Sequence, residues 1–313
     1  MNYADPKLSL IIITHDNGEY FIRALNSAVN QDATFPFEII VVMDDCNDST
    51  KEVVVSEKSK HPYINYFDVS FHCPLKNRLY GLEQAKGKYV IFLDGDDYLA
   101  PNMFSRMVSI MESEKADMVN CGLSYIKKGK IKPSKLVKDA TYDRNSALKA
   151  LFADTTFRAF LHTKIFLREK LLKMEFLGKI DIHNFMFEDA YLCFHYLLLC
   201  EKVVSIKDHL HFYDKTNEMS ATHKKGYSRC IDNVSVRSAI RNKIECMGES
   251  DLRKIFLSSK IRTRLLLSSD YFLSSFEDKK TKKEVLRKTK GDFKNAYSKN
   301  FDKEKVFYRD LLY

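Results

Sequence analysis

Four strand-like runs in the first hundred residues alternate with amphipathic stretches. The runs are Leu8–Ile13, Phe37–Met43, Tyr63–Val69 and Tyr89–Leu93. The first, second and fourth are mainly apolar, which is typical of parallel strands that are buried on both faces of a sheet. The segments between them, 19–31, 50–60 and 77–86, have apolar residues or capping signals typical of helices. This alternation predicts an α/β fold with a doubly wound, mostly parallel sheet.

Two of the expected strands end in carboxylates. Asp44 and Asp45 follow the second strand, and Asp94, Asp96 and Asp97 follow the fourth. The carboxyl ends of parallel strands meet at one edge of a sheet, where ligands bind. Clustered carboxylates repel one another unless a cation neutralises them, and hard oxygen ligands favour Mg²⁺ or Mn²⁺. The pattern predicts a divalent cation beside a substrate's phosphates, with an ordinary acidic turn as the alternative.

Further elements are expected downstream. We predict strands over 117–125 and 203–206, and helices over 146–152, 186–200, 231–247 and 251–276. The segment 126–140 is basic and irregular, and Lys127-Lys128-Gly129-Lys130 is typical of a hairpin turn, with a contact to a second substrate as the alternative. His162 is expected as a buried wall residue whose hydrogen bonds are satisfied.

Composition excludes several classes of protein. The chain has 313 residues, 45% of them hydrophobic and 30% charged, which is ordinary for a globular protein with a sizeable core. Its seven cysteines show no paired spacing, so we expect reduced thiols in the cytoplasm and neither a disulfide framework nor a structural zinc site. No apolar stretch reaches the roughly 20 residues that a membrane span needs, and the N-terminus has no signal-peptide pattern.

Positive charge is concentrated in the last part of the chain. Residues 224–313 contain 23 Lys and Arg against 12 Asp and Glu, whereas the whole chain has a net charge of +9. A basic tail beside a near-neutral body suggests an anionic partner, and Lys279, Lys280, Lys282 and Lys283 form an exposed basic run. Peripheral docking on an anionic membrane is one interpretation; a solvated helical face, packed on the rest of the chain or on a second copy, is the other.

Several segments, in order, resemble one enzyme family. The segments are 9–17 (SLIIITHDN), 24–31 (ALNSAVNQ), 38–45 (EIIVVMDD) and 78–97 (RLYGLEQAKGKYVIFLDGDD). Together they are similar to the inverting family 2 glycosyltransferases, closely over about residues 7–125 and more loosely around 187–189 and 209–220. The resemblance implies the GT-A fold, a Rossmann-like and mostly parallel sheet flanked by helices, here over residues 1–225. A basic helical C-terminal region, 226–313, would follow it.

The resemblance also implies a nucleotide site and a metal site. Thr14 matches the family position beside the uridine, Asp45 the acid that accepts from the uracil ring, and Arg78 an arginine near the nucleotide. Asp94 and Asp96 match the metal motif, with Asp96 as the direct ligand of Mn²⁺ or Mg²⁺ and Asp94 also among the nucleotide-binding residues.

Three positions depart from the family pattern or add to the site. Asp16 occupies a nucleotide-site position where the family usually has tyrosine. Asp97 is expected to hold Asp96 in place or to act through water. His223 is a further candidate metal ligand.

The resemblance assigns a pair of acids to the transfer step. Asp189 matches the family's general base, which would take the proton of an acceptor hydroxyl as that hydroxyl attacks the anomeric carbon. Glu188 beside it would orient one of the sugars. Two acids in the first turn of a helix are also favoured by the helix dipole alone, which is the structural alternative.

The expected function is therefore transfer of a sugar of the Gal, GalNAc, Glc or GlcNAc type. The donor would be a UDP-sugar, and the acceptor a glycan or a lipid-linked saccharide in bacterial surface polysaccharide synthesis, at the inner face of the cytoplasmic membrane. Two rivals remain at this point. A sugar-nucleotide nucleotidyltransferase needs a Gly-rich phosphate loop, which the segment after the first strand lacks, and a nucleic-acid-binding protein is suggested only by charge. We expect no nucleic-acid partner.

Overall fold

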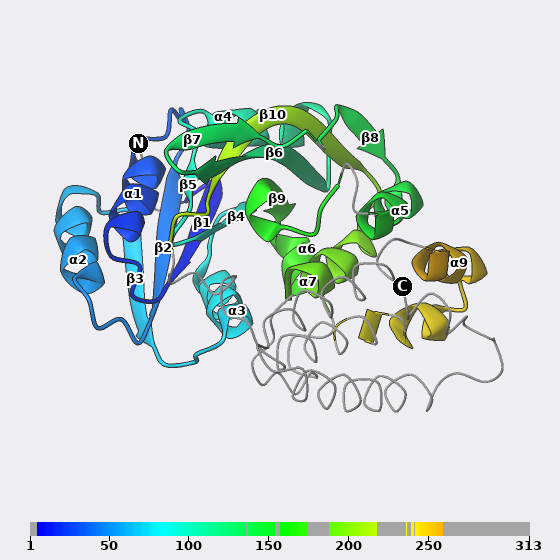
Figure 1. Cartoon of the computed structure of the whole chain (residues 1–313), viewed down its shortest axis with the longest axis horizontal. Helices are drawn as coiled ribbons and strands as arrows, with labels where there is room; N and C mark the ends of the chain where they lie inside the picture. Colours follow the sequence, from blue (N-terminus) through cyan, green and yellow to red (C-terminus); the bar gives the residue numbers. More distant parts are fainter. Residues whose placement is uncertain are drawn as a thin grey trace, which may run out of the picture. The chain divides into compact units, whose positions relative to one another are not determined.

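The computed structural model describes residues 5–135, 137–153, 157–174, 188–217, 236, 239–240 and 242–258 (Figure 1). The chain divides into two compact units, residues 1–223 and 224–313. The assignment of residues 1–225 to catalysis and of 226–313 to a basic helical region remains a prediction.

The described strands of the first unit form one ten-stranded sheet. They are β1 (Leu8–Thr14), β2 (Phe37–Asp44), β3 (Ile64–Val69), β4 (Tyr89–Asp94), β5 (Tyr98–Leu99), β6 (Met118–Lys127), β7 (Lys130–Pro133), β8 (Ala140–Tyr142), β9 (Lys164–Leu167) and β10 (Val203–Asp214). Their order across the sheet is β3-β2-β1-β4-β9-β6-β10-β5, with β7 beside β6 and β8 beside β10.

Helices connect these strands. The described helices are α1 (Gly18–Val29), α2 (Thr50–Lys60), α3 (Pro74–Gln84), α4 (Met103–Ser113), α5 (Arg144–Ala153), the short 3₁₀ helix η1 (Leu161–Thr163), α6 (Arg168–Leu172), α7 (Glu188–Leu197) and, in the second unit, α9 (Ser250–Ser258). The predicted α/β class with a mostly parallel sheet is confirmed.

The first four strands are parallel, and β1, β2 and β4 are buried on both faces, whereas β3 at the edge of the sheet is mostly only partly buried. Every residue of β1 and β2 is buried, as their mainly apolar runs predicted. Alternate side chains enter two cores: Leu10 and Ile12 pack with α1 and α4 on one face, while α3 covers Ile11 and Val42 on the other. Gly81 of α3 allows this approach, because a Cβ there would lie 2.5 Å from Ile11 Cγ2.

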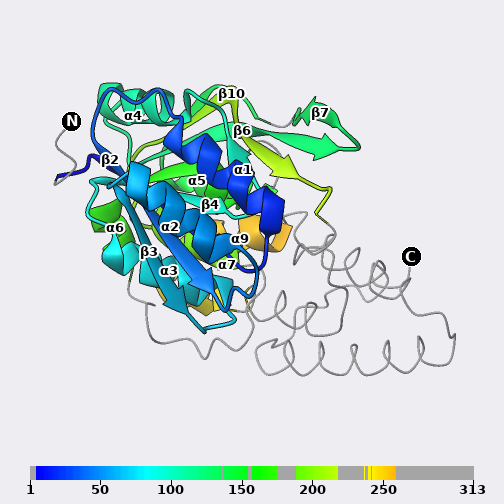
Figure 2. The same ribbon diagram turned by 90° about the vertical axis from the view of Figure 1, so that its left-hand side faces the viewer.

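The second half of the sheet is mixed. β9 runs antiparallel to both of its neighbours, β4 and β6, and β6 is parallel to β10. Figure 2 shows β6 and β7 extending together as a hairpin from the body of the sheet. β10 is one long strand that includes both 203–206 and 209–214, with register shifts between Ser205 and His211. The sequence predicted only its first part as a strand.

The second unit contains helical residues at 242–247 and the helix α9. The predicted helix over 251–276 is described only as far as Ser258, and the basic run at Lys279–Lys283 lies outside the described residues. Within the described part of the chain, no helix is long and apolar enough to cross a membrane. The cysteines in that part are all free thiols.

Candidate active site

The carboxyl ends of β1 and β4 lie side by side, which brings the acidic segment against Thr14. Ile13 pairs with Asp94 in the parallel ladder. Immediately afterwards, Gly95 passes so close to Thr14 that a Cβ at this glycine would lie 2.7 Å from Thr14 Oγ1. Contacts below 3.0 Å require displacement, so the segment after β4 needs glycine here to reach the edge of β1.

The two acids after β2 have different roles. Asp44 is buried and accepts hydrogen bonds from the backbone N–H groups of Phe71 and His72 and from Asn77 Nδ2, at 2.8 to 3.0 Å. It therefore holds the loop between β3 and α3. Asp45 has a left-handed backbone (φ 50°), and its side chain is 43% exposed, where it accepts from Ser70 Oγ. Only Asp45 is accessible to a ligand, in agreement with the residue that the resemblance selected.

Asp16 joins the loops that follow β1 and β2. Its Oδ1 accepts from the backbone N–H of Asn47 at 2.6 Å and from that of Asp48 at 3.3 Å. Asp48 in turn accepts from the N–H of Gly18 at the start of α1. Asp16 thus shapes the proposed nucleotide edge through these loops, whereas an aromatic residue at its position would offer a stacking surface.

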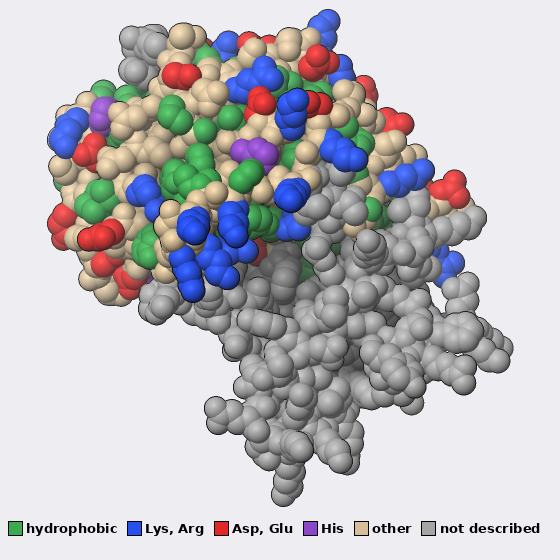
Figure 3. Space-filling view, turned by 45° about the horizontal axis from the view of Figure 1, so that its top comes forward, with side chains coloured by type: hydrophobic (Ala, Val, Ile, Leu, Met, Phe, Trp, Pro, Cys, Tyr) green, Lys and Arg blue, Asp and Glu red, His purple; other side chains and the backbone are tan. Residues whose placement is uncertain are grey.

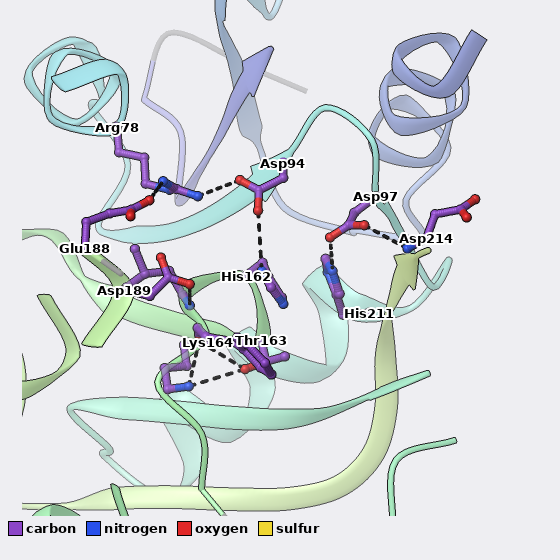
Figure 4. A network of polar contacts seen from close by, with 12 residues as sticks. Arg78, Asp94, Asp97, His162, Thr163, Lys164, Glu188, Asp189, His211 and Asp214 are labelled. Carbon is purple, nitrogen blue, oxygen red and sulfur yellow. Dashed lines mark hydrogen bonds and ion pairs between the residues drawn. The ribbon is translucent and has the colours of Figure 1, made fainter. Parts of the chain in front are cut away.

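Arg78 of α3 lies between two carboxylates from distant parts of the chain (Figure 4). Its Nη2 donates to Asp94 Oδ1 at 2.6 Å, and its Nη1 donates to Glu188 Oε1 at 2.5 Å. Burial disfavours its charged form, but the two carboxylates outweigh burial and hold the pKa of Arg78 above its ordinary value. Burial alone would likewise raise the pKa of Asp94, yet Arg78 lowers it well below the usual range. Asp94 is therefore ionised at neutral pH.

Asp189 follows Glu188 in the first turn of α7. Its Oδ2 accepts from the backbone N–H of Leu161 at 3.4 Å, whereas its Oδ1 is buried without a hydrogen-bond partner among the described residues. Burial, together with the negative charges of Glu188 and Asp94, raises the pKa of Asp189 to about 7 despite the opposing charge of Arg78. A carboxylate with an unused lone pair and a pKa near neutrality has the properties of a general base.

The loop that holds Asp189 is organised by Lys164. This buried ammonium donates to the backbone carbonyls of Arg158 and Phe160, at 2.5 and 2.6 Å, and lies 3.3 Å from Thr163 Oγ1. The three contacts fold residues 158–163 around it, which directs the N–H of Leu161 toward Asp189. Nothing in the local sequence pattern indicates that Lys164 is buried.

The acids after Asp94 differ in exposure. Asp96 is partly exposed, and its Oδ2 accepts from Asn217 Nδ2 at 3.2 Å.

Asp97, in contrast, is fully buried. Its Oδ1 accepts from the N–H of Asp214, and its Oδ2 lies 2.9 Å from His211 Nε2. Burial raises the pKa of Asp97 to about 8 and lowers that of His211 to about 3, so the pair is uncharged at neutral pH. Asp97 thus anchors β10, and its predicted role of holding Asp96 in place stays a prediction.

His162 forms the wall between Asp94 and the Asp97–His211 pair. Its ring stacks on His211 with 4.2 Å between centroids, and on Phe160 at 5.1 Å. The position as a buried wall residue is confirmed. The expectation that its hydrogen bonds are satisfied is wrong: neither ring nitrogen has a partner at hydrogen-bond distance in the part of the chain that the structure describes, and Nδ1 lies 3.6 Å from Asp94 Oδ2.

The donor set suits a hard divalent cation. Asp94 and Asp96 offer partly exposed carboxylate oxygens on either side of Gly95, and the low pKa of Asp94 keeps that group ionised. Among the described residues, three further groups have ligand atoms close enough for a metal: Asp97–His162–His211, Asp16–Cys46–Asp48 and Asp44–Asp45–His72. The carboxylates of the last two already accept loop hydrogen bonds, and the first is buried and uncharged, so Asp94 and Asp96 fit Mg²⁺ or Mn²⁺ better.

The structure therefore brings Arg78, Asp94, Glu188 and Asp189 together, and places Thr14, Asp16 and Asp45 on the neighbouring ends of β1 and β2. These positions do not test the predicted roles in binding and catalysis, which stay predictions. His223 lies outside the described residues. Sequence reasoning did not find the contact between Asn217 and Asp96, and only the looser resemblance around 209–220 pointed to that part of the chain.

Comparison with known proteins identifies the family. The family model described as "Glycosyl transferase family 2" matches residues 9–173, more than half of the chain. The chain belongs to glycosyl transferase family 2. The glycosyltransferase assignment made from the sequence is thereby confirmed.

Two curated relatives of this glycosyltransferase come from bacteria. It is 32% identical over 180 residues to the GalNAc(5)-diNAcBac-PP-undecaprenol beta-1,3-glucosyltransferase of Campylobacter jejuni, over 55% of this chain and 57% of that protein. It is 30% identical over 117 residues to the poly(ribitol-phosphate) beta-N-acetylglucosaminyltransferase TarS of Staphylococcus aureus, over 36% of this chain and 20% of that protein. The alignments thus span little more than half of the first relative and a fifth of the second.

Solved structures confirm the GT-A fold. The structure of S. aureus TarS 1-349 superposes with a TM-score of 0.69 at 20% identity, covering 93% of this chain and 80% of that one. The same protein in complex with UDP-GlcNAc gives a TM-score of 0.65 at 20% identity, over 85% and 80%. The mannosyltransferase PcManGT of Pyrobaculum calidifontis, in complex with GDP-Man and Mn²⁺, gives 0.56 at 14% identity, over 93% and 81%.

Proposed function

We propose that this glycosyltransferase moves a hexose from a UDP-sugar to a hydroxyl of a glycan or lipid-linked acceptor, with inversion at the anomeric carbon. The observation that supports this most is the state of Asp189: a carboxylate with one unpartnered buried oxygen and a pKa of about 7, beside the Arg78–Asp94 pair. Two bacterial relatives, named as transferases to a PP-undecaprenol-linked saccharide and to poly(ribitol-phosphate), support the setting. The TarS structures in complex with UDP and with UDP-GlcNAc support the donor.

The donor is proposed to lie across the ends of β1, β2 and β4. Thr14, Asp16 and Asp45 would surround the uridine, with Asp45 accepting from the uracil ring. Arg78, already shared between Asp94 and Glu188, would orient these carboxylates and add positive charge beside the diphosphate.

Mn²⁺ or Mg²⁺ would be held by Asp96 with Asp94, where the bound cation would neutralise negative charge on the departing diphosphate. Asn217 would keep the Asp96 carboxylate directed toward the donor. Asp97, bonded to the backbone of Asp214, would hold the segment that carries Asp96.

Asp189 would perform the proton transfer. As the acceptor oxygen forms its bond to the anomeric carbon, the bond from that carbon to the diphosphate oxygen breaks and UDP leaves with the electron pair. The proton of the acceptor hydroxyl passes to Asp189 Oδ1, because Oδ2 already accepts from Leu161. Attack opposite the leaving group inverts the configuration, and Glu188 would orient the sugar from the neighbouring position.

Slow donor hydrolysis tests the proposal without an acceptor. The full chain is incubated with UDP-Gal, UDP-GalNAc, UDP-Glc and UDP-GlcNAc, with Mn²⁺, with Mg²⁺ or with EDTA, and UDP release is measured. We expect release from at least one donor in the presence of a metal, and its loss in Asp96→Ala. Asp139→Asn is the control, because Asp139 lies on the surface beside Lys207. No release from any donor, with no binding of UDP, would contradict the proposal.

A further inference from the structure

One face of the β6–β7 hairpin and the end of β10 combines lysines with aromatic rings. Directly opposed residues in an antiparallel pair share a face, and so do residues two apart in a strand. Lys132 lies opposite Tyr125 and Lys130 opposite Lys127, while Tyr213 is the register partner of Tyr125 on β10. We call this set the cationic face; its members are Tyr125, Lys127, Lys130, Lys132, Tyr213 and Lys215.

The lysines of the cationic face are not neutralised. Lys127, Lys130, Lys132 and Lys215 are exposed, and none forms an ion pair with a described residue. No acidic residue occurs between 127 and 138. The hairpin turn adds Lys128, whose positive φ (51°) together with that of Gly129 (69°) gives the tight turn predicted from the sequence. Figure 3 shows a dense group of Lys and Arg side chains over this hairpin.

The aromatic rings lie directly beside these charges. Lys215 Nζ is 4.1 Å from the centre of the Tyr125 ring and 5.9 Å from that of Tyr213, and Arg158 donates to Tyr125 Oη at 3.0 Å. Partial burial lowers the pKa of Lys215, and repulsion from Lys127 and Arg158 adds to the effect. The cations therefore crowd one another, and an anion bound among them would relieve that repulsion.

The cationic face continues into the active site. The Tyr213 ring stacks beside His162 with 6.0 Å between centroids, and His162 contacts Asp94. The loop that contains Arg158 also contains Leu161, the donor to Asp189. An acceptor whose hydroxyl reaches Asp189 would thus extend over aromatic rings suited to sugars and then over lysines suited to anions. In the sheet, β6 and β10 lie on the other side of β4 from β1 and β2, where the nucleotide is proposed.

We propose that the cationic face is an acceptor subsite that binds phosphate groups, so that the acceptor is a saccharide chain carrying phosphodiester or diphosphate groups. This inference rests on the proposed function, because it extends the site at Asp189. The phosphates would be held by Lys127, Lys130, Lys132 and Lys215, and the sugar rings would pack on Tyr125 and Tyr213.

The test compares two variants of the full chain that lose the same charge. One is Lys127→Gln/Lys130→Gln/Lys132→Gln. The control is Lys86→Gln/Lys149→Gln/Lys173→Gln, at three exposed positions outside the cationic face. Equal loss of charge matters because residues 224–313 are also basic. The probes are a fluorescent oligo(glycerol phosphate), a neutral dextran oligosaccharide of equal length, and vesicles of phosphatidylglycerol or phosphatidylcholine.

We expect the wild type to bind the phosphate oligomer in a salt-sensitive manner. The Lys127→Gln/Lys130→Gln/Lys132→Gln variant, here the hairpin variant, should bind the oligomer on the order of tenfold more weakly. The control variant should bind like the wild type, and UDP release from the donor without acceptor should be equal in all three. Equal oligomer affinity of the two variants, or equal binding of dextran, would overturn the proposal. It would also fail if the hairpin variant lost only its binding to phosphatidylglycerol vesicles, because the face would then dock on lipid. Absence of donor hydrolysis in the wild type would count against the proposed function instead.

Discussion

Arg78 and Glu188 form a buried ion pair between residues 110 positions apart in the sequence, with 2.5 Å between Nη1 and Oε1. Because Arg78 also pairs with Asp94, its removal would leave two carboxylates without their cation. We expect Arg78→Met to lower the free energy of unfolding by about 3–5 kcal/mol, the usual effect of breaking a buried pair. Urea unfolding measures this loss. Arg106→Met, which breaks the exposed pair with Asp208, should cost less than about 1 kcal/mol. Equal losses in the two variants would contradict the prediction.

Substitution of Asp189 should separate chemistry from donor binding. Asp189→Asn keeps the shape and the Leu161 contact through its carbonyl oxygen but cannot accept a proton. Turnover should fall by about 10²- to 10⁴-fold, as for other general bases. The affinity for UDP, measured by calorimetry, should be unchanged. Near-normal turnover would transfer the role of base to another residue, with Glu188 as the first to test.

The raised pKa of Asp189 predicts a pH dependence. A base must be ionised, so turnover should increase as the pH rises through about 7 and fall about tenfold per unit below that value. The folded-state pKa lies above that of an unfolded aspartate, so the contribution of this group to stability decreases as the pH rises from about 4 to about 7. Asp189→Asn should therefore gain thermal stability relative to the wild type at pH 8 and not at pH 4. A flat turnover profile between pH 5.5 and 8 would count against Asp189 as the base.

Asp96 is predicted to determine the need for metal. Asp96→Ala should abolish UDP release, and millimolar Mn²⁺ or Mg²⁺ should not restore it. Asn217→Ala, which removes the donor to Asp96 Oδ2 at 3.2 Å and to Asn17 Oδ1 at 3.3 Å, should raise the Mn²⁺ concentration needed for half-maximal activity while keeping turnover at saturating metal. Titration of activity with Mn²⁺ distinguishes the two effects. Full activity of the wild type in EDTA would exclude the metal role.

The first half of the sheet was predictable because its signals are local. β1, β2 and β4 are mainly apolar runs, and their order places the acids that follow β2 and β4 at one edge by topology alone. Asp45 and Asp94 could be placed in this way, and the exposed turn at Lys128 and Gly129 also has a local signal.

The partners of those acids could not be predicted from local patterns. Asp97 and His211 are 114 positions apart, and each is unremarkable in its own segment. β9 has only four residues and includes the charged Lys164, so neither length nor hydrophobicity marks it as a central strand. Lys164 can be buried because three oxygen atoms accept from its ammonium group. No rule of sequence spacing predicts these three acceptors.

The position of β9 has a consequence for the order of folding. This strand, 164–167, lies between β4 and β6 and joins the two halves of the sheet. A nascent chain that ends before it would contain every strand from β1 to β8, yet β4 and β6 would lack their common neighbour and expose strand edges that favour association between chains. The two halves of the sheet can join only when β9 pairs with β4 and β6, and such pairing between strands far apart in the sequence slows folding. Because Asp189, His211 and Asn217 come later still, the polypeptide would become catalytically competent only after synthesis has passed residue 217.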